Sequence, residues 1–136
     1  RTPYRVHGSD SEFSVEGVEA LPRVDVIYVT ADVSPDFIDA AVENGAKGIV
    51  TAGVGNGNMT GGALEAVKRA VAQGVVVVRA SRVASGSVGR NVEIDDDAIG
   101  TVASGDLNPA KARVLLKLAL LQTRDPAKIQ DYFDRY

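Results

Sequence analysis

Four consecutive valines at Val75 to Val78 restrict the fold of this chain more than any other feature. β-Branched side chains favour extended backbone, and a strand that lacks polar alternation is one that is buried on both faces. Such burial is typical of a parallel sheet that helices cover on each side. We therefore expect a buried strand over 75–79, ending at Arg79.

Strands and helices alternate on the N-terminal side of this run. The expected elements are strands over 24–30, 48–51 and 75–79 and helices over 35–44 and 61–73. Each helix has a capping side chain before it, Ser34 or Thr60, and a glycine after it, Gly45 or Gly74. The β-α-β-α-β order requires right-handed crossovers. It predicts an α/β fold, a small parallel sheet of about four strands between layers of helices.

Further elements are expected in the last third of the chain. A short strand fits 101–103, and Asn108-Pro109 opens what we predict to be the longest helix, reaching about Thr123. Asp125-Pro126 opens a terminal helix that ends near Phe133. Apolar side chains wrap most of the way round the longer helix: Val114, Leu115, Leu116, Leu118, Leu120 and Leu121. Such a helix is buried inside the domain or against another subunit.

The composition is that of an ordinary soluble globular domain. The chain has 136 residues, of which 45% are hydrophobic and 24% are charged, enough for one domain with a real core. A net charge of −3 argues against nucleic-acid binding, and the longest apolar runs are too short to cross a membrane. Because the chain has no cysteine, disulfides and thiolate metal sites are excluded.

The N-terminal residues differ from the rest. Residues 1–22 are polar and contain the loop signal Gly8 to Ser11, so we interpret them as a strap or linker before an α/β domain over 23–136. His7 lies in this strap, and we expect it to be a surface or satisfied histidine. The first residues are neither a Met start nor a signal peptide, so we expect the chain to be part of a longer polypeptide.

A glycine-rich loop, Gly53 to Asn58, directly follows the strand expected at 48–51. In open α/β sheets the carboxyl ends of the strands are where ligands bind. Three interpretations remain open: a tight turn, a nucleotide site and a site for another polar ligand. The dinucleotide fingerprint fails at two points, because Asn58 replaces the third glycine and Arg79 and Arg82 stand where an acidic residue is expected.

Asn56 and Asn58 are the polar side chains of this loop. A carboxamide offers donors and an acceptor together, which suits a ligand that carries both an ammonium and a carboxylate. The alternative is that both residues simply adopt left-handed backbone conformations in a turn.

Acidic residues cluster at Glu93 and at Asp95 to Asp97. They lack the spacing of a calcium loop, so we interpret the three aspartates as a solvated turn or a helix N-terminus. Glu93 lies between Val92 and Ile94, an alternation that could aim it at a site. No G-x-S-x-G, Cys–His or H-E-x-x-H motif is present, so we expect no catalytic nucleophile, metal or cofactor, and only half of a site.

Several long stretches resemble one known family. They are residues 48–58, 77–83, 102–116 and 123–136. Together they are similar to the C-terminal domain of bacterial type II L-asparaginases, within the asparaginase/glutaminase family. One departure is Ala84, where relatives often have Pro, which implies a less rigid loop over 80–91.

The resemblance implies a function and a set of site residues. Such enzymes hydrolyse L-asparagine to L-aspartate and ammonia, act more weakly on L-glutamine, and use a threonine of a larger N-terminal domain as nucleophile. Asn58 and Glu93 would contact the substrate of a neighbouring subunit, with Gly55, Asn56 and Gly57 as loop support.

The resemblance also implies the assembly and the compartment. It predicts a homotetramer built as a dimer of dimers, in the periplasm or secreted, and a chain that is inactive without its own N-terminal domain. The alternative is a non-catalytic module that binds a nucleotide or another small molecule.

Overall fold

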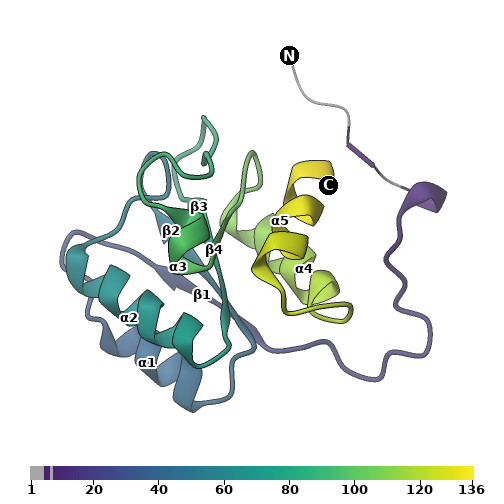
Figure 1. The fold of residues 1–136 in the computed structure, drawn as a ribbon, viewed down its shortest axis with the longest axis horizontal. Coiled ribbons are helices and arrows are strands. Elements are labelled where there is room, and N and C mark those ends of the chain that lie inside the picture. Colours follow the sequence, from purple (N-terminus) through teal and green to yellow (C-terminus); the bar gives the residue numbers. More distant parts are fainter. Residues whose placement is uncertain (1–4, 7) are drawn as a thin grey trace.

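The computed structural model describes residues 5, 6 and 8–136, so His7 lies outside the described residues. A four-stranded parallel sheet with the order β1-β2-β3-β4 forms its centre (Figure 1). The strands are β1 (Val24–Tyr28), β2 (Gly48–Gly53), β3 (Val76–Ser81) and β4 (Thr101–Ala103). The predicted α/β fold with a small parallel sheet is confirmed.

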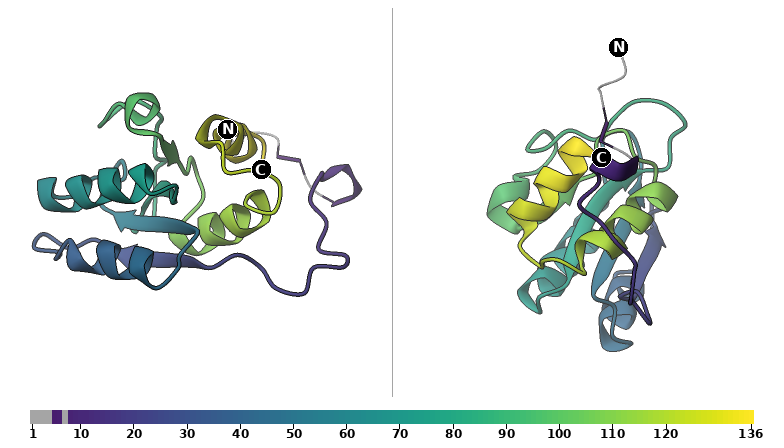
Figure 2. Two further views of the ribbon diagram at one scale, coloured as in Figure 1. Left: turned by 60° about the horizontal axis from the view of Figure 1, so that its bottom comes forward. Right: turned by 90° about the vertical axis from the view of Figure 1, so that its right-hand side faces the viewer.

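Helices cover both faces of the sheet (Figures 1 and 2). One layer consists of α1 (Asp36–Glu43) and α2 (Gly61–Ala72), and the other of α4 (Pro109–Ala119) and α5 (Pro126–Arg135). The short α3 (Asp96–Ile99) precedes β4, and the 3₁₀ turn η1 (Gly8–Asp10) lies near the N-terminus. The result is a three-layer α/β/α arrangement, because each face of the sheet needs apolar cover.

The valine run lies at the centre of this arrangement. Val76 and Val78 belong to the core under α4 and α5, whereas Val75 and Val77 belong to the core under α1 and α2. Successive side chains of a strand point to opposite faces, so an unbroken apolar run supplies both cores at once. This is the burial on both faces that the run predicts.

The helix after Asn108 differs from its prediction. It ends at Ala119 and has 11 residues, one fewer than the 12 of α2, so it is not the longest helix. Beyond Ala119 the chain tightens, because the Gln122 N–H bonds to the Ala119 carbonyl, three residues back, at 2.9 Å. Burial is also one-sided: Leu116 is fully buried, but Val114 is 55% exposed.

The caps largely follow the sequence. Thr60 accepts from the Ala63 N–H at 3.2 Å, and Asn108 accepts from the Lys111 N–H at 3.0 Å. Gly45 and Gly74 have φ of 85° and 80°, the left-handed conformation expected at a helix end. The cap expected at Ser34 is wrong, because α1 begins at Asp36, its N-cap is Pro35, and no side chain caps it.

The N-terminal segment packs against α5. The Phe13 ring lies 4.9 Å from that of Tyr132 and 5.0 Å from that of Tyr136, between centroids. Glu12 pairs with Arg135 at 2.6 Å. None of the helices within residues 5–6 and 8–136 combines the length and apolar character that a membrane span needs.

The sequential strand order has a consequence for the site. Ligand crevices of open α/β sheets form where the strand order reverses, and this order does not reverse within the described chain. The carboxyl ends of β2 and β3 instead continue into two loops on the same edge of the sheet, the β2–α2 loop (residues 54–60) and the β3–α3 loop (residues 82–95). These loops carry the candidate site residues.

Candidate functional site

The glycine-rich segment forms a tight hairpin. The Asn58 N–H donates to the Val54 carbonyl at 2.8 Å, and the Val54 N–H donates back to the Asn58 carbonyl at 3.3 Å. Gly55 and Gly57 have φ of 51° and 76°. Glycine adopts this left-handed conformation without steric cost, so the hairpin depends on both. The structure therefore shows the tight turn among the three interpretations, and the backbone bonds of this turn do not use the side chains of Asn56 and Asn58.

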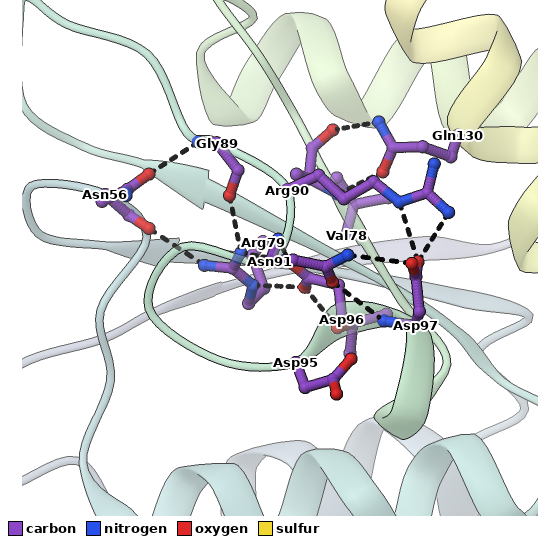
Figure 3. A network of polar contacts seen from close by, with 12 residues as sticks. Asn56, Val78, Arg79, Gly89, Arg90, Asn91, Asp95, Asp96, Asp97 and Gln130 are labelled. Carbon is purple, nitrogen blue, oxygen red and sulfur yellow. Dashed lines mark hydrogen bonds and ion pairs between the residues drawn. The ribbon is translucent and has the colours of Figure 1, made fainter.

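Asn56 points toward the β3–α3 loop. Its side-chain Oδ1 accepts from the Gly89 N–H at 2.6 Å, and its carbonyl accepts from Arg79 Nη1 at 2.9 Å (Figure 3). The alternative that Asn56 and Asn58 adopt left-handed backbone is wrong, because Asn91 is the only described non-glycine residue with positive φ. The glycines take the left-handed positions, so the asparagines do not need to.

A buried ion pair lies beneath the two loops. Arg79 donates from Nε and Nη2 to the two carboxylate oxygens of Asp96, at 2.7 and 2.6 Å, and their side chains are 1% and 0% exposed (Figure 3). Asp96 also accepts from the Thr101 hydroxyl at 2.5 Å and from the Asn91 N–H at 2.9 Å. The carboxylate is therefore bonded on all sides.

These bonds determine the ionisation of Asp96. Burial by itself raises the pKa of the carboxyl group, but the hydrogen bonds from Arg79, Thr101 and Asn91, with the Arg79 charge, bring its pKa below the ordinary value. Asp96 is thus held as an anion.

The interpretation of the three aspartates as a solvated turn or a helix N-terminus holds in part. Asp95 caps α3 by accepting from the Ala98 N–H at 2.9 Å, and the exposed Asp97 pairs with Arg90 at 2.6 Å. Asp96 is instead fully buried, because it is the counter-ion of Arg79. The sequence did carry a signal for this pair: a charged side chain on a strand that is buried on both faces requires a buried partner.

Glu93 is exposed near the end of the β3–α3 loop, two residues before the N-cap of α3 at Asp95. Its segment is not a strand, so the alternation of Val92 and Ile94 does not orient it. Val92 itself is 65% exposed. Among the described residues, no hydrogen bond or ion pair engages the Glu93 carboxylate or the Asn58 carboxamide. Both groups are therefore available to a ligand.

Asn58 and Glu93 meet at one surface depression of about 290 Å³. It is lined by Gly57, Asn58, Met59, Leu64, Arg79, Glu93 and Ile94. The Arg79 charge is neutralised by Asp96, so Glu93 is the carboxylate left to attract a cation. The lining has no hydroxyl or thiol, and no metal-binding cluster of His, Cys, Asp and Glu occurs within the described part of the chain. The depression therefore offers one unpaired carboxylate and one carboxamide, and its lining supplies no nucleophile.

Comparison with known proteins identifies the family. The family model of the glutaminase/asparaginase C-terminal domain matches residues 23–133. The chain is 48% identical over 136 residues to "L-asparaginase 2" of Escherichia coli and 46% identical over 136 residues to "Probable L-asparaginase periplasmic" of Haemophilus influenzae. Each alignment covers 100% of this chain and 39% of the relative.

A third relative has a broader name. "Glutaminase-asparaginase" of Acinetobacter glutaminasificans is 42% identical over 139 aligned residues, which cover 100% of this chain and 42% of the relative. The resemblance drawn from the sequence motifs is thus confirmed, and the chain belongs to the glutaminase/asparaginase C-terminal domain family.

Proposed function

We propose that this chain is the C-terminal domain of an L-asparaginase, an amidohydrolase that converts L-asparagine to L-aspartate and ammonia. The relatives named L-asparaginase support this activity, and the chain spans 39% of their length. The relative named glutaminase-asparaginase supports an additional activity on L-glutamine, which we propose to be the weaker one. In this proposal residues 1–22 link the domain to a larger N-terminal domain, and residues 23–136 form the α/β domain.

The observation that carries the proposal is that Asn58 and Glu93 line the same depression and that this depression contains no nucleophile. The substrate has an α-ammonium, and Glu93 is its natural partner because the carboxylate has no other engagement among the described residues. The Asn58 carboxamide satisfies remaining polar groups of the substrate. These contacts align the side-chain amide for attack by a threonine from the N-terminal domain of a neighbouring subunit.

The same division of labour has consequences for assembly and location. A site shared between subunits needs at least a dimer, and we propose a homotetramer arranged as a dimer of dimers. No cofactor takes part. A periplasmic location is supported by the name of the Haemophilus influenzae relative.

Ammonia release by the full-length protein tests the proposal. We expect release from L-asparagine, slower release from L-glutamine, and a higher KM for L-asparagine in Glu93→Gln, which removes the charge and keeps the shape. This chain alone, once circular dichroism has shown that it is folded, should release no ammonia. Tight nucleotide binding in calorimetry, with no ammonia from either amide, would favour the alternative of a non-catalytic binding module.

A further inference from the structure

We infer that Arg79 is a positioning residue for Asn58 and Glu93. The buried guanidinium of Arg79, within β3, bonds to both of the loops that carry these side chains (Figure 3). The inference rests on the function proposed above, in which Asn58 and Glu93 bind the substrate.

The contacts of Arg79 reach both loops. Its Nη1 donates to the Asn56 carbonyl of the β2–α2 loop at 2.9 Å, and its Nη2 donates to the Gly89 carbonyl of the β3–α3 loop at 3.1 Å. Among the described residues, no other side chain donates to backbone carbonyls of both loops. The planar fork of five donors on an arginine makes such a junction possible.

Asn56 joins the two loops a second time. Its Oδ1 accepts from the Gly89 N–H at 2.6 Å, beside the two carbonyls that Arg79 holds. Asn56 precedes Asn58 by only two residues, and consecutive Cα atoms are about 3.8 Å apart, so a displacement of the junction moves the Asn58 carboxamide directly.

Asp96 closes the loop that presents Glu93. Its Oδ2 accepts from the Asn91 N–H at 2.9 Å, so both ends of the segment 91–96 meet at the same carboxylate. Asn91 makes the turn with φ of 58°, and its side chain bonds to Asp97 at 2.8 Å. Glu93 therefore lies at the tip of a small closed loop whose base is the Arg79–Asp96 pair. The distance between the Asn58 carboxamide and the Glu93 carboxylate thus depends on Arg79 rather than on either loop alone.

The test uses Arg79→Lys in the full-length enzyme. Lysine keeps a positive charge for Asp96 but lacks the fork that reaches two carbonyls. We expect KM for L-asparagine to rise roughly tenfold, the equivalent of one lost charged hydrogen bond. Hydrogen exchange of the amides in residues 54–58 and 89–95 should accelerate in both loops together.

Gln130→Met is the matched control. Gln130 is 3% exposed and bonds to the Ala103 N–H at 2.8 Å and the Ala103 carbonyl at 3.2 Å, and among the described residues it makes no hydrogen bond to either loop. This variant should lose stability while KM and the exchange of both loops stay at wild-type values. A loss of stability alone is therefore not expected to raise KM or to accelerate exchange in the two loops, as Arg79→Lys should.

A double-mutant cycle separates positioning from general structure. If Arg79 acts through Glu93, Arg79→Lys should raise KM much less in the Glu93→Gln background than in the wild type. Equal increases in both backgrounds would overturn the inference, as would wild-type exchange of both loops in Arg79→Lys. An unchanged KM in Glu93→Gln would instead reject the proposed function, and the exchange measurement would still decide the role of Arg79.

Asn56→Ala keeps the inference testable if Arg79→Lys does not fold. This variant leaves the buried ion pair intact and removes only the bond between Asn56 Oδ1 and the Gly89 N–H. We expect a several-fold higher KM and faster exchange in both loops. Wild-type KM and exchange in Asn56→Ala would then contradict the coupling of the loops.

Discussion

The base and the tip of the small closed loop over residues 91–96 contain two carboxylates in opposite environments. Asp96, at the base, is 0% exposed and accepts from Arg79, Thr101 and Asn91. Glu93, at the tip, is exposed and has no polar partner among the described residues. Only two residues lie between them, so the difference comes from the contacts of the folded chain and not from local sequence.

The two carboxylates of this loop have different roles, one in stability and one in ligand binding. A buried carboxylate is tolerated only where its own chain supplies the counter-charge and the hydrogen bonds, as Arg79 does for Asp96. An exposed carboxylate needs neither and can take its partner from a ligand. We therefore expect substitutions at the base to lower stability, with an effect on KM only through the displaced loops, and substitutions at the tip to lower activity alone.

The largest effect is expected for Asp96→Ala. Removing one partner of a buried pair leaves the Arg79 charge uncompensated, which costs about 3–5 kcal/mol of unfolding free energy. Urea denaturation measures this loss, with the exposed Asp97→Ala as a control that should remain near wild type. Equal denaturation midpoints for Asp96→Ala and the wild type would contradict the structural role of the base.

A smaller effect, on activity alone, is expected for Glu93→Ala. The variant should fold normally, but kcat/KM for L-asparagine should fall by a factor equivalent to about 2 kcal/mol of transition-state stabilisation, because the substrate ammonium loses its charged partner. Steady-state kinetics and urea denaturation of the full-length protein measure the two quantities. If the unfolding free energy of Glu93→Ala falls and its kcat/KM does not, Glu93 has the structural role that we assign to Asp96.

Asn58→Ala should have a more selective effect. This side chain contacts the substrate without carrying charge, so its loss shifts substrate placement by roughly 1 kcal/mol or less. The ratio of kcat/KM for L-asparagine to that for L-glutamine should change. If both activities fall by the same factor, Asn58 contributes to the site but does not determine the preference between the two amides.

The smallest effect is expected in the acid dependence of stability. The pKa of Asp96 in the folded state lies below the ordinary 3.8, so its contribution is fully present above that pH and is lost as the pH falls through the folded pKa. Below about pH 4 the unfolding free energy should therefore fall more steeply in the wild type than in Asp96→Asn. Parallel curves would show that Asp96 does not ionise as its contacts indicate.

Much of the fold could be predicted because it depends on local patterns. The valines at 75–78, the caps at Thr60 and Asn108 and the glycines at 45 and 74 each determine backbone conformation or burial within a few residues. The end of α4 could not be predicted in this way. The apolar pattern continues past Ala119, and tertiary packing decides where the helix tightens and which side chains remain exposed.

The candidate site was predictable only in part. Asn58 and Glu93 emerged from motifs and a family resemblance, and the structure brings both to one depression. The Arg79–Asp96 pair was missed, because its partners are 17 residues apart and their contact depends on how the β3–α3 loop folds back. The signal was a lone arginine in an apolar strand.

The sequence by itself determined the order of strands and helices and the need for two apolar layers, since periodicity and capping act over short distances. The tertiary structure decided which acid became a buried counter-ion and which remained free. That choice depends on desolvation and on hydrogen-bond partners from distant segments, which exist only when β3, β4 and the two loops are assembled.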